Sequence, residues 1–310
     1  MKNLLEWVNK NKYEIAWGSI ELLKEIKIEM IKLGETGAVH QFLTNFLIKR
    51  DYLEGIKLQN LKSIFAVAIP CKEQGLIFNF NDKRYKILIS PGYVNRKLID
   101  TKIFNELSNI LNGNIEQISL IPIKNLSVKL GLTAYGRNNI TYIPNLGSYF
   151  SLLCFVSNFD FGCKFSSVKI ENTSLNNCEN CYKCVKACPT GAFSKENSVV
   201  NFDQCICRFS VMKEKFPEWI NPKWYNRLFG CMICQKVCPE NAQFNKSRIE
   251  VICEFTSEET VQLLDGYNPM TAPDSDKLKK KIFSLGLSFY YGINISEYIG
   301  RNLKALLYQI

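Results

Sequence analysis

The sequence of 310 residues contains one histidine, His40. Because imidazole is the commonest metal ligand and the usual base near neutral pH, this scarcity excludes a histidine-rich zinc or iron site. It also leaves a single candidate base for a Ser–His or Cys–His nucleophile pair. Also lacking is an apolar run of about 18 residues, which a transmembrane helix requires. The N-terminus carries charges every few residues and does not resemble a secretory signal, so we expect a cytoplasmic protein without membrane contact.

The composition is that of a globular protein. Hydrophobic residues make up 46% of the chain and charged residues 22%, which excludes a disordered protein. The formal net charge of +10 suggests an anionic partner, although metal-bound thiolates would lower this charge. The chain carries 13 cysteines. In a reducing cytoplasm such cysteines serve metals or catalysis, and a disulfide framework is not expected.

Local patterns predict an α+β protein in three parts. Residues 1–165 are expected to form a mixed α/β domain, residues 166–245 a cysteine-rich domain of short elements, and residues 246–310 a helical tail. Apolar spacing predicts helices near residues 23–33 and 103–111. Strands are expected at residues 64–69, 76–80, 85–90, 115–123, 140–143 and 149–157. In the tail, Thr256 and Glu259 form a capping box, and further helices are expected at residues 275–285 and 298–307.

The strongest motif is a Cys-x2-Cys-x2-Cys-x3-Cys-Pro run that begins at Cys178. It is the bacterial ferredoxin run for a [4Fe–4S] cluster, in which the first three thiolates share one cluster and the fourth ligates the other. A second motif, Cys-x2-Cys-x3-Cys-Pro, begins at Cys231 and lacks the first cysteine at close spacing. Either Cys205 or Cys207, upstream of it, can supply the missing ligand.

The crossed rule divides the cysteines into two ligand sets. The first set is Cys178, Cys181, Cys184 and Cys238, and the second contains Cys188, Cys231, Cys234 and either Cys205 or Cys207. Zinc is the alternative, because paired Cys-x2-Cys units bind it well. The closely spaced run favours a cube of iron and sulfur over a single tetrahedral ion, and the remaining cysteines are explained as free buried thiols.

The cysteine region resembles epoxyqueuosine reductase. It comprises CENCYKCVKACPTGAF and, further on, FDQCICRFSVMKEKFPEWINPKWYNRLFGCMICQKVCPENAQF. The family has a cysteine after an acidic stretch, then a Pro-Glu-rich insert and an Asn-Arg-Ile-Tyr-Gly segment. Here those places are taken by Asp203-Gln204-Cys205, Pro217-Glu218 and Asn226-Arg227-Leu228-Phe229-Gly230. This matching favours Cys205 over Cys207 as the eighth ligand.

The resemblance continues upstream and covers about residues 120–310. Residues 131–138, GLTAYGRN, look like the family's Gly-Leu-Gly-Trp-(Ile/Thr)-Gly-Lys-(Asn/His), and residues 144–150, PNLGSYF, look like its Gly-Ser-(Trp/Phe)-Phe segment. Residues 301–307 look like the start of its helical-repeat tail. The resemblance implies cobalamin in the N-terminal domain, contacted by Gly131, Leu132, Gly136, Arg137, Asn138, Gly147 and Ser148. It also implies two [4Fe–4S] clusters that pass electrons to the cobalt for reduction of an epoxide on a modified tRNA base.

The sequence departs from the family at the proton donor. The family has an aspartate upstream of the Gly-Leu pair, and an ungapped comparison places Gln117 there. A shift of one residue would offer Glu116, and otherwise Tyr135 is the candidate donor. The family's Glu-Arg-Pro that follows is Ile123-Lys124-Asn125 here, and its Gly-Trp pair is Thr133-Ala134. We therefore regard the chain as a divergent relative.

Two functions are consistent with these features. The first is a reductase with two [4Fe–4S] clusters and cobalamin, which takes electrons from reduced ferredoxin or flavodoxin and acts on a bound substrate such as a modified tRNA base. The second is an electron-transfer protein that docks on a partner enzyme without cobalamin. DNA is not an expected partner. A basic cluster at Lys277, Lys279, Lys280 and Lys281 suits either RNA phosphates or a solvated helix face.

Overall fold

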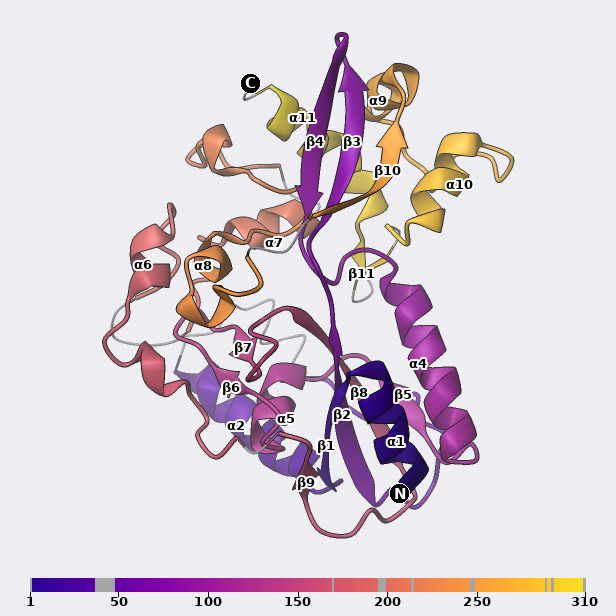
Figure 1. Cartoon of the computed structure of the whole chain (residues 1–310), viewed down its shortest axis with the longest axis vertical. Helices are drawn as coiled ribbons and strands as arrows, with labels where there is room; N and C mark the ends of the chain where they lie inside the picture. Colours follow the sequence, from indigo (N-terminus) through magenta and orange to yellow (C-terminus); the bar gives the residue numbers. More distant parts are fainter. Residues whose placement is uncertain are drawn as a thin grey trace.

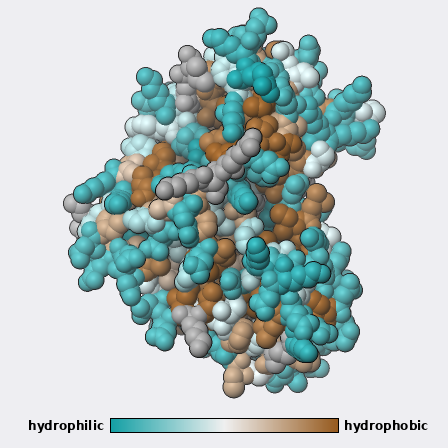
Figure 2. Space-filling view, in the orientation of Figure 1, coloured by the Kyte–Doolittle hydropathy of each residue, from teal (hydrophilic) through white to brown (hydrophobic). Residues whose placement is uncertain are grey.

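The computed structural model describes residues 2–36, 48–168, 170–194, 199–212, 215–245, 249–287, 289–290 and 293–308. His40 lies outside these residues. The chain forms two regions that lie one above the other in Figure 1, with the cysteine-rich segments at one side between them. Hydrophilic side chains dominate the outline of this face, whereas hydrophobic ones gather toward its middle (Figure 2). Within the described residues, no helix is long and apolar enough to cross a membrane.

The lower region is built on an antiparallel sheet of five strands in the order β5-β8-β2-β1-β9. Its long central strands, β2 and β8, pair along their whole length from Ser63↔Ser157 to Pro70↔Phe150. The strands are β1 (Glu14–Ser19), β2 (Ser63–Pro70), β5 (Glu116–Ile118), β8 (Phe150–Ser157) and β9 (Phe165–Ser166). Nearly every residue of β2 and most of β8 are buried, because both faces of the sheet are covered.

Helices from the N-terminal half cover the two faces of this sheet. One face packs with α2 (Leu22–Glu35) and α5 (Ile123–Lys129), and the other with α1 (Lys2–Asn11) and α4 (Arg96–Ile110). The alternation of the sheet explains this division, since Ala66 and Cys154 face the first layer while Phe65 and Phe155 face the second. A two-stranded hairpin, β6 (Ala134–Tyr135) and β7 (Thr141–Tyr142), follows α5.

The upper region combines segments that are far apart in the sequence. The hairpin β3 (Gln74–Phe80) and β4 (Lys83–Ile89) pairs through β3 with the parallel strand β10 (Glu250–Phe255). Helices α9 (Ser257–Leu264), α10 (Lys277–Ser284) and α11 (Ile299–Leu307) complete this core, and the short pair β11 (Phe289–Tyr290) and β12 (Ile293–Asn294) precedes α11. Phe78 and Phe255 stack across the strands with ring centroids 4.6 Å apart. The packing therefore groups residues 74–94 with the C-terminal third, and does not follow the expected division at residue 165.

In its described residues, the cysteine-rich segment forms short helices. They are α6 (Lys183–Ala187), α7 (Ile206–Val211) and α8 (Ile233–Lys236). Single turns of 3₁₀ helix precede α6, lie between α7 and α8, and follow α8. Helices α6 and α8 contact each other, and each precedes the last cysteine of its motif. Segments this short have little core of their own, so the regions above and below must hold them in place.

Most of the expected elements are confirmed. The Asn81–Asp82 turn has φ of 50° and 58°, as a two-residue hairpin turn requires, and the capping box at Thr256 and Glu259 is present. The expected strand at residues 115–123 is shorter, because it ends at Ile118 and the chain then enters α5. Apolar residues in that stretch pack as a helix start against the sheet, which a run of isoleucines alone does not distinguish from a strand.

The C-terminal helix α11 holds the insert between the two cysteine motifs. The buried Asn302 side-chain amide donates to the backbone oxygens of Ser210 and Leu228, each at 2.8 Å. The neighbouring Arg301 guanidinium donates to the backbone oxygens of Phe209 and Met212, each at 2.7 Å. The tail is therefore part of the support for α7 and the second cysteine motif.

We expect Asn302→Ala to destabilise the protein by about 1–3 kcal/mol, because two buried carbonyl groups lose their donor. Thermal unfolding followed by circular dichroism measures the change. Lys304→Ala, on the exposed face of the same helix, is the matched control and should change the melting temperature little. Equal melting temperatures for the two variants would contradict the role assigned to Asn302.

Candidate iron–sulfur and cofactor site

The first set of expected ligands lies together. Cys178, Cys181, Cys184 and Cys238 line one small cavity of about 20 Å³. Cys184 is on α6 and Cys238 follows α8, so the packing of these helices brings the fourth cysteine to the first three. Burial raises the pKa of the Cys184 and Cys238 thiols, and negative charge on Cys178 raises both further.

The second set lies at one end of a much larger cavity. Cys188, Cys205, Cys207, Cys231 and Cys234 all line it. Burial raises the pKa of Cys205 to about 12, and it raises the pKa of Cys234 well above its ordinary value. Cys234 also interacts electrostatically with Cys231, Cys205, Cys184 and Cys188. The interaction with Cys184 shows that the two thiol sets are neighbours.

Cys205 and Cys207 occupy different surroundings. Both thiols interact with Cys231, and Cys205 also interacts with Cys234. The Cys207 sulfur in addition lies 3.6 Å from the Tyr93 hydroxyl oxygen. Burial raises the pKa of both thiols. The choice of Cys205 over Cys207 as the eighth ligand stays a prediction.

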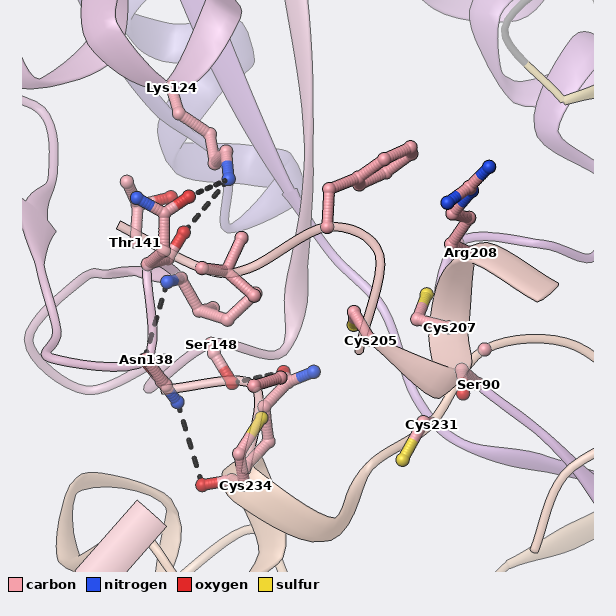
Figure 3. A pocket seen from close by; sticks show the side chains of 18 of the residues that line it. Ser90, Lys124, Asn138, Thr141, Ser148, Cys205, Cys207, Arg208, Cys231 and Cys234 are labelled. Carbon is pink, nitrogen blue, oxygen red and sulfur yellow. Dashed lines mark hydrogen bonds between the residues drawn. The ribbon is translucent and has the colours of Figure 1, made fainter. Parts of the chain in front are cut away.

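The large cavity has a volume of about 670 Å³ and lies between the lower sheet region and the cysteine motifs. Its walls are mostly apolar, with contributions from α5, the β6–β7 hairpin, the start of β8 and the cysteine-rich segment. Of the described residues that line it, none carries a carboxylate, and Lys124 and Arg208 carry positive charge. Figure 3 shows Lys124 entering from one side and the labelled cysteines from the other. Arg208 forms an ion pair with Asp203.

The loop of the β6–β7 hairpin joins the cavity to both cysteine motifs. The Arg137 guanidinium donates to the Cys178 backbone oxygen at 2.9 Å and lies 4.4 Å from the Tyr182 ring centre. The Asn138 side-chain amide donates to the Tyr142 hydroxyl at 2.8 Å and to the Cys234 backbone oxygen at 3.5 Å. The Tyr142 hydroxyl in turn interacts with the Cys238 thiol. One short loop therefore contacts residues of both thiol sets.

A second contact is made by the expected Gly147–Ser148 segment. Gly147 has a φ of +57°, and an added Cβ would overlap the Asn241 side chain and lie 3.0 Å from the Glu240 backbone oxygen. The Ser148 amide donates to Asn241 Oδ1 at 2.8 Å, and its hydroxyl donates to Gln235 Oε1 at 2.7 Å. Glycine permits this close approach to the turn that follows the second cysteine motif.

The expected cofactor contacts fall into two groups. Asn138 and Ser148 line the large cavity, whereas Gly136 and Arg137 line the small cavity of the first thiol set. Gly131, Leu132 and Gly147 line neither cavity. Leu132 is fully buried in the core, and Gly131 has a φ of +76° at the end of α5. None of the three therefore lines the cavity in which we expected them to contact the cofactor.

The two expected proton donors differ sharply. Glu116 does not line the cavity, because its carboxylate accepts hydrogen bonds from the backbone amides of Lys57 and Leu58. The structure therefore corrects the choice of Glu116. Tyr135 does line the cavity. The pKa of its hydroxyl is raised mainly by burial and to a smaller extent by the negative charge of Glu29. A raised pKa keeps the phenol protonated at neutral pH, so Tyr135 can donate a hydrogen bond.

Sequence reasoning missed several cavity residues. Lys124 Nζ donates to the Asn139 backbone oxygen at 2.8 Å and to Asn139 Oδ1 at 3.1 Å. Burial lowers the pKa of this ammonium group, while the thiols of Cys205 and Cys207 raise it. Ser90 Oγ also lines the cavity and has no hydrogen-bond partner among the described residues. In the sequence, the position of Lys124 at the place of the family's arginine was the one indication that any of these residues lies in the site.

The zinc alternative requires several ligands to converge on one ion. In the part of the chain that the structure describes, no group of three or more His, Cys, Asp or Glu side chains is placed to hold a single metal ion. A [4Fe–4S] cube instead takes its thiolates at separate iron corners.

Comparison with known proteins defines the class of the cysteine region. Residues 177–241 match the family model described as a 4Fe-4S double cluster binding domain. The two motifs therefore form an iron–sulfur domain of the two-cluster kind, as expected.

Whole proteins extend the match. The chain is 34% identical to epoxyqueuosine reductase of Bacillus subtilis over 261 residues, which are 74% of this chain and 64% of that one. It is 26% identical to the enzyme of Staphylococcus aureus over 212 residues, covering 64% of this chain and 53% of that one. The chain is thus similar to epoxyqueuosine reductases over as much as 74% of its length, which confirms the resemblance seen in its motifs. These matches span about half to two thirds of the curated relatives' length.

The fold agrees. A structure of epoxyqueuosine reductase from Bacillus subtilis, with its catalytic aspartate loop swung out of the active site, superimposes with a TM-score of 0.64 at 22% identity. The match covers 99% of this chain and 80% of that one. A structure of the enzyme in complex with an epoxyqueuosine-modified tRNA stem loop gives the same TM-score at 20% identity.

We expect Gly147→Ala to lower both the melting temperature and the iron content of anaerobically purified protein, because the added Cβ pushes Asn241 away from the second motif. Gly113→Ala is the matched control, since Gly113 has a φ of +76° but nothing within 4 Å of an added Cβ. Backbone strain alone costs roughly 1–2 kcal/mol at either position. If both variants lost the same stability and kept all their iron, the contact would have no part in holding the motif.

Proposed function

We propose that the protein is an iron–sulfur oxidoreductase of the epoxyqueuosine reductase type, in which a bound substrate is reduced inside the 670 Å³ cavity. The observation that carries this proposal is the position of the second thiol set at the end of that cavity, next to the first set. Electrons that reach the first cluster can pass to the second and then to a guest in the cavity.

We propose the ligand sets that the crossed rule gives. One cluster is held by Cys178, Cys181, Cys184 and Cys238, and the other by Cys188, Cys205, Cys231 and Cys234. This crossed assignment is supported because the first four line one small cavity and the second four line the other. Several contacts reach the sulfur atoms, such as the Arg137 amide 3.4 Å from Cys178 Sγ and the Thr190 hydroxyl 3.4 Å from Cys188 Sγ. Such contacts help to set the reduction potential.

The residues present fit a cobalamin in the large cavity. The walls of the cavity are mostly apolar, and uncharged polar groups such as Asn138, Ser148 and the unpartnered Ser90 Oγ face it. When bound, cobalamin would supply reductive chemistry at its cobalt. Residues of the chain would surround it, exclude water through the apolar wall, and place it beside Cys205 and Cys234.

The reaction defines what the other cavity residues must do. Reduction of an epoxide to an alkene takes up two electrons and two protons and releases the oxygen as water. Tyr135, whose hydroxyl stays protonated, can donate a hydrogen bond in the cavity. We propose a modified tRNA base as the substrate and reduced ferredoxin or flavodoxin as the electron donor.

An electron-transfer protein without cobalamin is the second candidate. The loss of the family's aspartate favours it, since Glu116 does not reach the cavity. The basic cluster gives little support to RNA binding, because Lys279 pairs with Asp274 and Lys281 with Glu259. The large cavity next to the second thiol set favours the reductase, because a docking protein needs no such space.

The ligand assignment predicts the iron content of cysteine variants. Cys184→Ser and Cys234→Ser should each lower bound iron and acid-labile sulfide substantially and lower the melting temperature, because cluster binding contributes to folding. Cys207→Ser and Cys163→Ser should keep the iron of the parent protein. Loss of a cluster in Cys207→Ser would move the eighth ligand from Cys205 to Cys207, and unchanged iron in the first two variants would overturn the assignment.

The proposed reaction is tested on an epoxyqueuosine-modified RNA stem loop with reduced flavodoxin, under anaerobic conditions. Mass spectrometry should show loss of one oxygen atom from the modified base when cobalamin is added, and no loss without it. Conversion that does not depend on cobalamin would contradict its assignment to the cavity. No conversion with the cofactor present would leave the electron-transfer function as the better explanation.

A further inference from the structure

The charge of the cavity is unusual for a site expected to contain a carboxylic acid. Of the described residues that line it, Lys124 and Arg208 are charged, and both are cations. Arg208 forms an ion pair with Asp203 and lies 5.2 Å from the Phe202 ring centre. Among the described residues, the cavity therefore offers its guest a cationic hydrogen-bond donor, Lys124, and no carboxylic acid.

Lys124 is held at a fixed place in the wall. It lies in the first turn of α5, and its ammonium group donates to two oxygens of a single residue, Asn139. Asn139 has a φ of +57° in the β6–β7 loop, and this left-handed conformation lets its backbone and side-chain oxygens meet the same ammonium group. Because the nitrogen is fixed through two bonds, a guest meets it without a further loss of side-chain entropy.

The ammonium group still has donor capacity for a guest. It carries three N–H groups, and two of them have acceptors among the described residues. Lys124 lines the same cavity as Cys205, Cys231 and Cys234, which belong to the thiol set that would supply electrons. In Figure 3 its nitrogen enters the cavity from the side of α5, while Cys205, Cys231 and Cys234 enter from the cysteine motifs.

We propose that Lys124 is the catalytic residue that contacts the reacting oxygen of the substrate in this cavity. The third N–H donates a hydrogen bond to the epoxide oxygen, and the positive charge stabilises the negative charge that develops there as the C–O bond breaks. The oxygen leaves as water after taking up two protons that derive from solvent. Two electrons come from the clusters, and Lys124 itself is neither oxidised nor consumed.

This inference rests on the proposed function, and it predicts a binding difference that needs no turnover. Two RNA stem loops serve as probes, one with epoxyqueuosine and one with queuosine, which lacks the epoxide oxygen. The parent protein with its clusters assembled should bind the epoxide form more tightly, on the order of tenfold for a hydrogen bond from a charged donor. Fluorescence anisotropy measures both dissociation constants without added reductant.

Substitution of Lys124 distinguishes a hydrogen bond to the epoxide oxygen from a role in holding Asn139 in place. In Lys124→Met the two RNAs should bind with equal affinity, because the affinity falls for the epoxide form alone. In Lys124→Gln part of the difference in affinity should remain, because the amide can still donate a hydrogen bond. A merely structural role, such as holding Asn139, would weaken both RNAs by the same factor. Lys129→Met is the matched control, since Lys129 is on the same helix but pairs with Glu25 and Glu29 and does not line the cavity.

Three outcomes overturn the inference: equal binding of both RNAs by the parent protein, an unchanged difference in Lys124→Met, or the same loss in Lys129→Met. If Lys124→Met does not fold, the same comparison is made with Lys124→Gln, whose iron content and melting temperature are checked first. A parent protein that discriminates between the RNAs yet reduces neither would retain this contact and refute the proposed reaction. The two hypotheses therefore fail separately.

Discussion

The structure depends on bringing two groups of cysteine thiols together in the interior. Burial and mutual repulsion raise the pKa of Cys234, Cys205 and Cys184, so without iron these thiols hold their protons. Iron that binds their thiolates releases these protons to solvent and supplies the positive charge that the buried sulfur atoms require. The exchange of the last cysteine between motifs requires the two motifs to lie side by side, and α6 and α8 do contact each other. In the crossed assignment that we propose, neither motif is completed unless the other is in place.

The rest of the chain holds this arrangement from several sides. Glu73, which is buried after β2, pairs with Arg227 at 3.0 Å and with Lys236 at 3.1 Å, and so ties the lower sheet to the insert and to α8. A buried pair of this kind contributes less to stability than to a defined arrangement, since desolvation offsets its attraction. Asn302 holds the insert from the other side. The cavity exists because these contacts keep the cysteine motifs at a set distance from the sheet.

The sequence predicts the cluster region well because its chemistry is local. Fixed spacing within each cysteine motif determines which thiols share a loop, and the prolines determine where each loop turns. The sequence does not predict that residues 74–94 join the C-terminal third, because the parallel pairing of β3 with β10 joins segments far apart in the chain. It also misassigned Glu116, whose carboxylate is taken by the amides of Lys57 and Leu58 in the fold. Lys124 became a candidate only when α5 placed it opposite the thiols.

The most direct test of the account is the ratio of cobalt to iron in protein purified anaerobically with added cobalamin. The account predicts about one cobalt for every eight irons, since two four-iron clusters lie beside one cofactor cavity. Eight irons with no cobalt in the parent protein would contradict the reductase and would reduce the lower region to a surface on which another enzyme docks.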